Sequence, residues 1–196
     1  MPRPGRKEQV LEAAAALFSR KGYHSTTVRD IAEESGMLSG SLYAHFAGKE
    51  EMLFAIVERS ADQFVAAAQP IVDGPGPASA KLRAAMAAHL QVVAASLDAA
   101  TIFLHEWKVL SPERRAVVKA KRSAYESLLA QIIHQGVATG EFRPVDEKFA
   151  RLLVLSAVNW LYEWYDPNGP LGPEAVADKF AELLLHGLMR EGGEET

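Results

Sequence analysis

The chain has 196 residues, of which 48% are hydrophobic and 23% are charged, and its formal net charge is −4. These totals are ordinary for a globular protein with one or two compact units. The absence of cysteine excludes disulfides, thiolate metal sites and cysteine nucleophiles. The six histidines never occur at HxxxH spacing, so we expect no metal site.

The charge is distributed unevenly along the chain. Residues 1–49 carry seven Lys or Arg and five Asp or Glu, whereas residues 50–196 carry fourteen and twenty. The net negative charge therefore does not argue against nucleic acid, because the first part is mildly basic. Glu8 and Glu12 interrupt the apolar run near the N-terminus, and no window approaches about 20 uninterrupted apolar residues. We expect a cytoplasmic protein without a membrane span.

Apolar residues recur at helical spacing and no run alternates with period two, so the sequence predicts an all-α fold of nine helices. The first three are short and form an N-terminal head. The first ends near Gly22, and the second opens at Thr27, which with Asp30 makes a carboxylate variant of the capping box, and closes at Gly36. The third has one apolar sector, formed by Leu38, Leu42 and Phe46.

Six mostly longer helices follow. The fourth starts at Lys49, bridges head and body, and ends before the break "DGPGP" at residues 73–77. The next helices are expected over residues 78–97, 98–108, 112–140, 146–167 and from 173 onward. We place the functional domain boundary near residues 48–50, so that residues 1–49 form the head, residues 50–190 the body and residues 191–196 a flexible tail.

The second and third helices have the size and the Gly-containing turn of a helix-turn-helix. Small side chains at Gly40 and Ala44 would let the third helix approach a major groove, and Ser39 and Tyr43 could then reach bases or phosphates. The ammonium of Lys49 could bind a phosphate together with backbone N–H groups of its helix. A generic three-helix domain would show the same apolar spacing.

Two further residues of the head allow two interpretations each. His45 fits either core packing or a phosphate contact, and Arg29 fits either a phosphate contact or a solvated surface. The residues expected to contact DNA are Thr27, Arg29, Ser39, Gly40, Ser41, Tyr43, His45 and Lys49.

The stretch "TTVRDIAEESGMLSGSLYAHFAGKEEML" resembles the N-terminal domain of the TetR family of transcriptional regulators, and the segment Val10 to Thr26 fits the family's first helix. Gly48 stands where the family often has an N-capping Ser, Asn or Asp. The resemblance covers about a quarter of the chain and implies a homodimeric all-α repressor that binds a palindromic DNA operator and senses a small molecule. It is carried by Thr27, Ile31, Ala32, Gly36, Gly40, Leu42, Tyr43, His45, Phe46, Lys49 and Glu50.

The helix predicted over residues 146–167 is apolar almost all round, so both of its sides must be covered. One side can face the core of its own subunit, and the other is most simply covered by a second subunit together with the last helix. We assign the dimer interface to Val158, Leu161, Tyr162, Tyr165, Phe180, Leu184, Leu185 and Leu188.

The opposite side carries Trp160 and Trp164, which fit either ordinary core or the wall of a ligand cavity; the polar residues beside them favour the cavity. A basic stripe on the helix after Pro112 is either a solvated face or the site of an anionic ligand tail. The residues expected to bind the ligand are His105, Trp107, Arg115, Lys119, Arg122, Ser156, Asn159, Trp160, Glu163 and Trp164.

Residues 103–115 and 159–188 resemble the ligand domain of TetR-type regulators of fatty-acid and steroid breakdown, which respond to acyl-coenzyme A thioesters. This resemblance implies an acyl-CoA effector and no bound cofactor, while an aromatic or other hydrophobic effector stays open. Two rival classes are an acyl-thioester enzyme and a dimeric adaptor that has lost DNA binding. Because no nucleophile–base pair and no Gly-rich phosphate loop occurs, we expect no catalytic residues.

Overall fold

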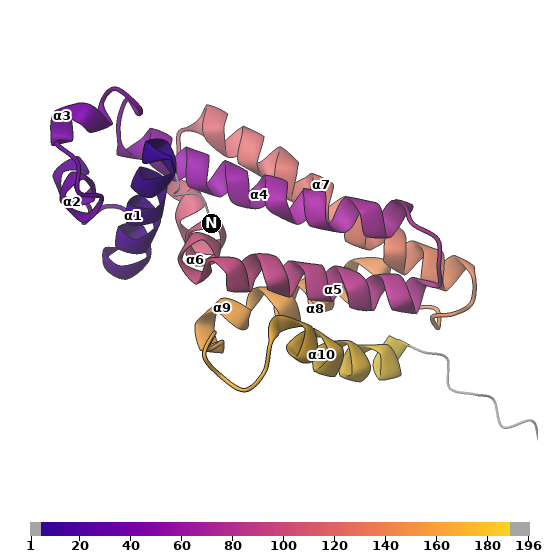
Figure 1. Cartoon of the computed structure of the whole chain (residues 1–196). Coiled ribbons are helices and arrows are strands. Elements are labelled where there is room, and N and C mark those ends of the chain that lie inside the picture. Colours follow the sequence, from indigo (N-terminus) through magenta and orange to yellow (C-terminus); the bar gives the residue numbers. More distant parts are fainter. Residues whose placement is uncertain (1–4, 189–196) are drawn as a thin grey trace, which may run out of the picture. The chain divides into compact units, whose positions relative to one another are not determined.

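The computed structural model describes residues 5–188, with side chains up to residue 187. Its helices are α1 (Arg6–Lys21), α2 (Val28–Glu34), α3 (Ser39–Leu42), α4 (Lys49–Asp73), α5 (Ala78–Ala95), α6 (Leu97–His105), the 3-10 helix η1 (Glu106–Val109), α7 (Pro112–Ala138), α8 (Glu147–Asn159), α9 (Leu161–Trp164) and α10 (Pro173–Leu188) (Figure 1). The predicted all-α fold is confirmed. Within the described residues all nine expected helices are present, and the eighth is divided at Trp160 into α8 and the single turn α9. The expected tail, residues 191–196, lies outside the described residues.

The chain forms two compact units. The first holds the described residues up to Asp62 together with Ser96–Lys121, and the second holds Gln63–Ala95 together with the residues from Arg122 onward. The boundary expected near residues 48–50 falls inside the first unit, because α1 packs against α6 as well as against α2. Among the described residues no single helix is long and apolar enough to cross a membrane, and α5 with the segment 97–109 reaches that size only as a bent pair.

The first unit is built on the apolar faces of α1 and α2, where Val10, Phe18 and Ile31 are buried. The predicted capping box is present at the start of α2. Thr27 Oγ1 accepts a hydrogen bond from the Asp30 N–H (3.1 Å), and the Asp30 carboxylate accepts one from the Thr27 N–H (2.8 Å). These hydrogen bonds fix the entry to α2 and hold the pKa of the Asp30 carboxyl below its usual value.

The turn between α2 and α3 begins at Gly36, whose φ of 65° lies in the left-handed region that glycine adopts without strain. Leu42 and Phe46 are buried after it, as predicted. The placement of Leu38 in the same apolar sector is wrong, because its side chain is 81% exposed. Leu38 is the extended N-cap residue of α3 (φ −71°, ψ 138°), so helical spacing does not determine where its side chain points.

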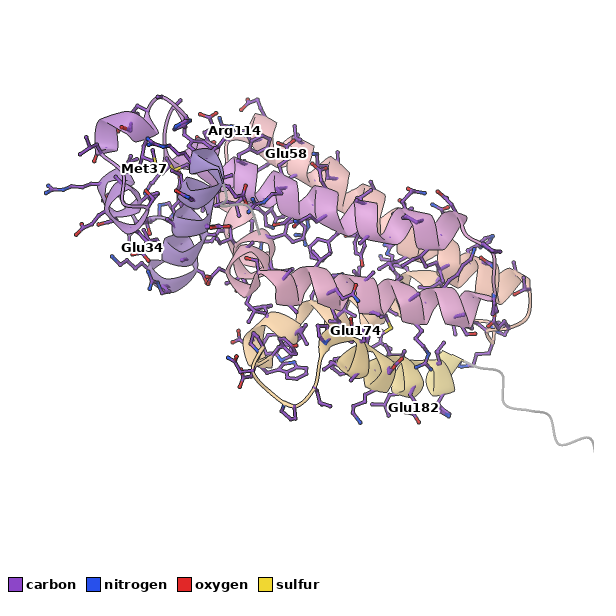
Figure 2. All side chains as sticks on the ribbon, viewed as in Figure 1. Glu34, Met37, Glu58, Arg114, Glu174 and Glu182 are labelled. Atoms are coloured by element: carbon purple, nitrogen blue, oxygen red, sulfur yellow. The ribbon has the colours of Figure 1, made fainter. Side chains whose placement is uncertain are left out.

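In the second unit, α10 lies along α5 and also contacts α8, while α5 contacts α8 and α9 (Figure 1). Two polar contacts join α10 to α5. Arg83 donates a hydrogen bond to the Asp178 carboxylate (3.0 Å), and Gln91 donates one to the carboxylate of Glu174 (2.7 Å), which Figure 2 labels. The buried apolar face of α5 includes Leu82, Met86, Leu90 and Val93.

Two close fits position the segment that follows α7. The Glu141 carboxylate accepts hydrogen bonds from the backbone N–H groups of Ala78 (2.7 Å) and Ser79 (3.0 Å), which caps the N-terminus of α5. The ring of Phe142 packs directly on Gly136, where a Cβ atom would overlap the ring. These contacts hold the start of α8 in a defined place in the second unit.

The burial of α8 and α9 reverses the assignment made for their two faces. Val158 and Leu161, which we expected in the dimer interface, are 1% and 0% exposed and belong to the core of the second unit. Trp160 and Trp164, which we expected to line a cavity, are 57% and 47% exposed. Spacing separates the two faces correctly, but because both faces are apolar it does not tell which one packs on α5.

The remaining residues expected in the interface differ in their burial. Leu185 is buried in the core of the second unit and is therefore also excluded from an interface. The side chain of Leu188 lies outside the described part of the chain. The half-buried members of the set are Tyr162, Tyr165, Phe180 and Leu184.

Candidate functional site

The surface around α3 carries most of the residues that were expected to contact DNA. The exposed members are Thr27, Arg29, Gly40, Tyr43 and His45, and the half-buried members are Ser39, Ser41 and Lys49. Because His45 is exposed, core packing is excluded for it. Leu38 also belongs to this surface and was missed, although its place just before the first turn of the helix could have indicated an exposed N-cap.

The ammonium of Lys49 contacts the loop that leads into α2. This ammonium donates hydrogen bonds to the backbone carbonyls of Tyr23 (2.9 Å), His24 (3.3 Å) and Thr26 (2.8 Å), and it lies 4.5 Å from the centroid of the Tyr23 ring. Thr26 is buried, and its hydroxyl donates to the Gly22 carbonyl (2.9 Å). The donors of Lys49 hold the loop that leads into α2, so we expect a structural role for this residue in place of the predicted phosphate contact.

Ion pairs connect the first half of α4 with the first half of α7 inside the first unit. Glu50 accepts a hydrogen bond from the Ser111 N–H (2.9 Å) and pairs with Arg114 (3.5 Å). Lys121 pairs with Glu58 at 3.1 Å; Figure 2 labels Glu58 and Arg114. Each of these partly exposed pairs contributes at most about 1 kcal/mol, so their main effect is to fix the relative position of the two helix segments.

The second unit exposes an apolar face on α8 and α10. Phe149 is 66% exposed, Leu153 is 56% exposed and Leu183 is 73% exposed, and these three side chains line a groove of about 530 Å³. Leu184 and Arg143 lie on the same groove. The large apolar side chains Leu152, Trp160 and Trp164 are also exposed on α8, at its C-cap and on α9. A concentration of exposed apolar side chains of this kind is typical of a protein–protein interface.

The core of the second unit contains a polar cluster formed by helices α4, α5 and α7. The Nδ1 atom of His89 lies 2.8 Å from the hydroxyl of Tyr125, and the ring of Phe64 packs against His89 in a tilted arrangement with centroids 4.5 Å apart. Burial lowers the pKa of His89 to about 3, and the Asn159 side chain offsets this only in part. His89 is therefore neutral at physiological pH.

The other ring nitrogen of His89, Nε2, is the atom of this cluster that could bind a polar ligand group. Nε2 is buried and makes no hydrogen bond of normal geometry among the described residues, although the Asn159 side chain lies close enough to influence the pKa of His89. Buried polar atoms are nearly always paired with protein, water or ligand, so this atom is suited to bind a polar group that enters the core. Asn159 is the residue of the expected ligand set that the structure places near this cluster.

The other residues expected to bind the ligand are divided between the two units. His105, Trp107, Arg115 and Lys119 belong to the first unit, whereas Arg122 belongs to the second. Arg115 is exposed and donates a hydrogen bond to the Lys108 carbonyl (3.3 Å), and burial lowers the pKa of the half-buried Arg122. The exposed members on α8 and α9 or between them are Ser156, Trp160, Glu163 and Trp164.

The chain matches two family models. Residues 10–56 match "Bacterial regulatory proteins, tetR family", and residues 75–188 match "Tetracyclin repressor-like, C-terminal domain". The transcriptional repressor KstR2 of Mycobacterium tuberculosis is 31% identical over 95% of this chain and 94% of its own length. The solved structure of that ketosteroid transcriptional regulator aligns with a TM-score of 0.89, covering 95% of this chain and 96% of that chain.

Two further proteins are similar over almost the whole chain. The crystal structure of AibR in complex with isovaleryl coenzyme A and operator DNA has a TM-score of 0.82 and 32% identity, covering 92% of this chain and 98% of AibR. The fatty acid metabolism regulator protein of Bacillus subtilis is 23% identical over 92% of this chain and 94% of its own length. These relatives are transcriptional regulators and not enzymes. The chain belongs to the TetR family of bacterial transcriptional regulators.

Proposed function

We propose that this protein is a homodimeric transcriptional repressor that binds a palindromic operator and releases it when an acyl-CoA thioester binds. The observation that carries the DNA and acyl-CoA parts of the proposal is the similarity to AibR, whose structure contains isovaleryl coenzyme A and operator DNA. Because that structure holds both together, release of the operator is a separate part of the proposal. The similarity to the repressor KstR2 supports repression by the bound protein. The exposed surface around α3 supports DNA binding by the head.

The homodimer is supported by the apolar face of α8 and α10. Each of the side chains Phe149, Leu153 and Leu183 exposes more than half of its surface. Exposure of apolar surface to water is unfavourable, and a second copy that covers these side chains removes this free-energy cost. A twofold interface places the same patch of each copy against the other. We therefore move the expected interface from Leu161 and Leu185 to this exposed face.

The effector site is supported by the His89 cluster. If the Tyr125 hydroxyl donates to Nδ1, the neutral imidazole carries its proton on Nε2, which can then donate to the carbonyl oxygen of a thioester. Because His89 is enclosed in the core, a ligand reaches it only when the surrounding helices of the second unit move apart. A ligand that binds only this altered packing shifts the population toward it, as release of the operator requires.

Calorimetry with the full-length protein tests the effector. We expect a long-chain acyl-CoA to bind more tightly than the matching free acid and than coenzyme A alone. Tyr125→Phe removes the hydroxyl that orients His89 and should weaken acyl-CoA binding about fivefold to thirtyfold, which corresponds to one hydrogen bond of about 1–2 kcal/mol. Ser127→Ala, at an exposed position on the same helix, is the control. Equal affinity for the acid and the thioester would exclude the acyl-CoA proposal.

The anionic part of coenzyme A needs cationic partners, for which Arg115, Lys119 and Arg122 remain our proposal. The triple replacement of these three residues by Ala should remove the preference for thioester over acid. If the preference persists in the triple variant, the basic stripe is a solvated surface. A hydrophobic aromatic acid that binds better than any acyl-CoA would instead favour the alternative effector class.

A further inference from the structure

The segment that reads DNA in this fold has an unusual composition here. Residues 35–48 contain no Arg, Lys, Asn, Gln, Asp or Glu. These are the side chains that make the strong hydrogen-bonded contacts with guanine, adenine and cytosine in the major groove. Most of the exposed groups that α3 and its flanks can offer are therefore small, apolar or aromatic, and His45 is the exposed residue among them that can carry a positive charge. Direct reading of bases by this surface therefore depends on hydroxyl groups, on His45 and on apolar contacts.

Leu38 is the most exposed of the large apolar residues in the described chain, at 81%. It occupies the N-cap of α3, where Ser, Thr, Asp and Asn are favoured because their side chains accept a backbone hydrogen bond. No side-chain cap is present at Leu38. Leu38 therefore lowers the stability of the free protein in two ways, because it exposes apolar surface and because it provides no side-chain cap for α3. Both costs have an explanation if a partner covers the side chain.

We propose that Leu38 reads the C5-methyl group of thymine in the operator and sets its sequence preference. The inference rests on the proposed binding of DNA by the head. Thymine is the base that presents a methyl group in the major groove, and an apolar side chain distinguishes it from cytosine by contact with that methyl. The exposed Gly40 and Ala44 have little or no side chain, so they leave room for the start of α3 to come close to the base edges.

The size of the effect follows from the burial of one methyl group. Burying a single methyl or methylene group is worth about 0.8 kcal/mol, which is about a fourfold change in affinity. A symmetric operator has two half-sites, so loss of the contact in both should weaken binding about fifteenfold. This range is well resolved by fluorescence anisotropy with a labelled duplex.

The test begins with an operator selected by the full-length protein from a pool of random duplexes. Each thymine of the operator is then replaced by deoxyuridine, which removes only the methyl group. We expect one thymine per half-site at which the wild-type protein loses about fourfold, and cytosine at that position should be improved by 5-methylation. Leu38→Ser should lose the distinction between thymine and deoxyuridine at this position and at no other.

Leu38→Ser also separates reading from folding. Serine is a favoured N-cap, so the variant should unfold at the same temperature as the wild type or higher, while it binds the operator more weakly. Val117→Ala, at another exposed apolar position in the first unit, should leave both the affinity and the thymine preference unchanged. The inference is overturned if no thymine replacement weakens the wild type, or if Leu38→Ser keeps the same thymine preference. Failure to select any operator would overturn the proposed DNA binding as well, so the two failures are distinguishable.

Discussion

Replacement of Lys49 by Met tests whether this residue supports the fold or contacts DNA. The change keeps most of the aliphatic stem and removes the ammonium that binds the carbonyls of Tyr23, His24 and Thr26. Two of these three hydrogen bonds are partly buried, and a hydrogen bond to a charged group contributes about 1.5–3 kcal/mol. Because one ammonium makes both, we expect a combined loss of about 3 kcal/mol. For a chain of this size that lowers the midpoint of thermal unfolding by about 6–12 °C.

The same variant should leave the salt dependence of operator binding unchanged, because no phosphate contact is lost. Arg29→Ala is the matched comparison, since Arg29 is exposed at the start of α2 and we expect it to contact a phosphate. A dimer carries two heads, so this variant should reduce the slope of log affinity against log salt by about two without a loss of stability. Circular dichroism gives the midpoint and anisotropy gives the slope, below the unfolding temperature. A Lys49→Met protein with an unchanged midpoint and a slope reduced by about two would refute the structural role.

Three other changes test the second unit. Phe149→Glu places a charge on the exposed apolar face, so light scattering should show soluble monomers. Leu161→Glu should unfold the protein, because that site is fully buried. A Phe149→Glu protein that is still dimeric would show that another face forms the interface. The pKa of His89 is about 3 in the folded chain and about 6.5 when unfolded, so its contribution is fully present above pH 6.5 and is lost at about 1.4 kcal/mol per pH unit as the pH falls toward 3. His89→Gln should flatten this part of the stability curve, and a wild-type curve with no such slope would contradict the burial of a neutral imidazole. Gly136→Ala should lower the free energy of unfolding by about 1–3 kcal/mol in chemical denaturation, because its Cβ displaces the ring of Phe142; a gain in stability, as expected for alanine on an open helix surface, would contradict the close fit.

The helices and the head could be predicted from the sequence because their signals are local. The capping box at Thr27 and Asp30 and the apolar spacing of Leu42 and Phe46 depend on residues within one or two helical turns. Leu38 shows the limit of this reasoning, because the residue just outside a helix does not follow the helical period. The helical period therefore placed Leu38 in the core, whereas its N-cap position leaves the side chain exposed.

The two faces of α8 could not be assigned from the sequence for a different reason. Leu161 and Trp160 are both apolar, and the choice between them depends on which face α5 and α10 cover. The contact of Lys49 with the loop before α2 spans more than twenty residues, so local pattern gives no sign of it. His89 was missed as a candidate, because a single histidine in an apolar helix carries no spacing signal until Tyr125 is placed beside it.

The central claim is that one dimer binds an operator and releases it in response to an acyl-CoA. The most direct measurement is the anisotropy of the labelled, selected operator, first titrated with the full-length protein and then with ligand at saturating protein. We expect sequence-specific binding by one dimer, followed by a return of the anisotropy to that of free DNA on addition of a long-chain acyl-CoA. The free acid and coenzyme A should have little effect at the same concentration. Operator binding that persists at every acyl-CoA concentration, with the ligand bound by calorimetry, would contradict the claim.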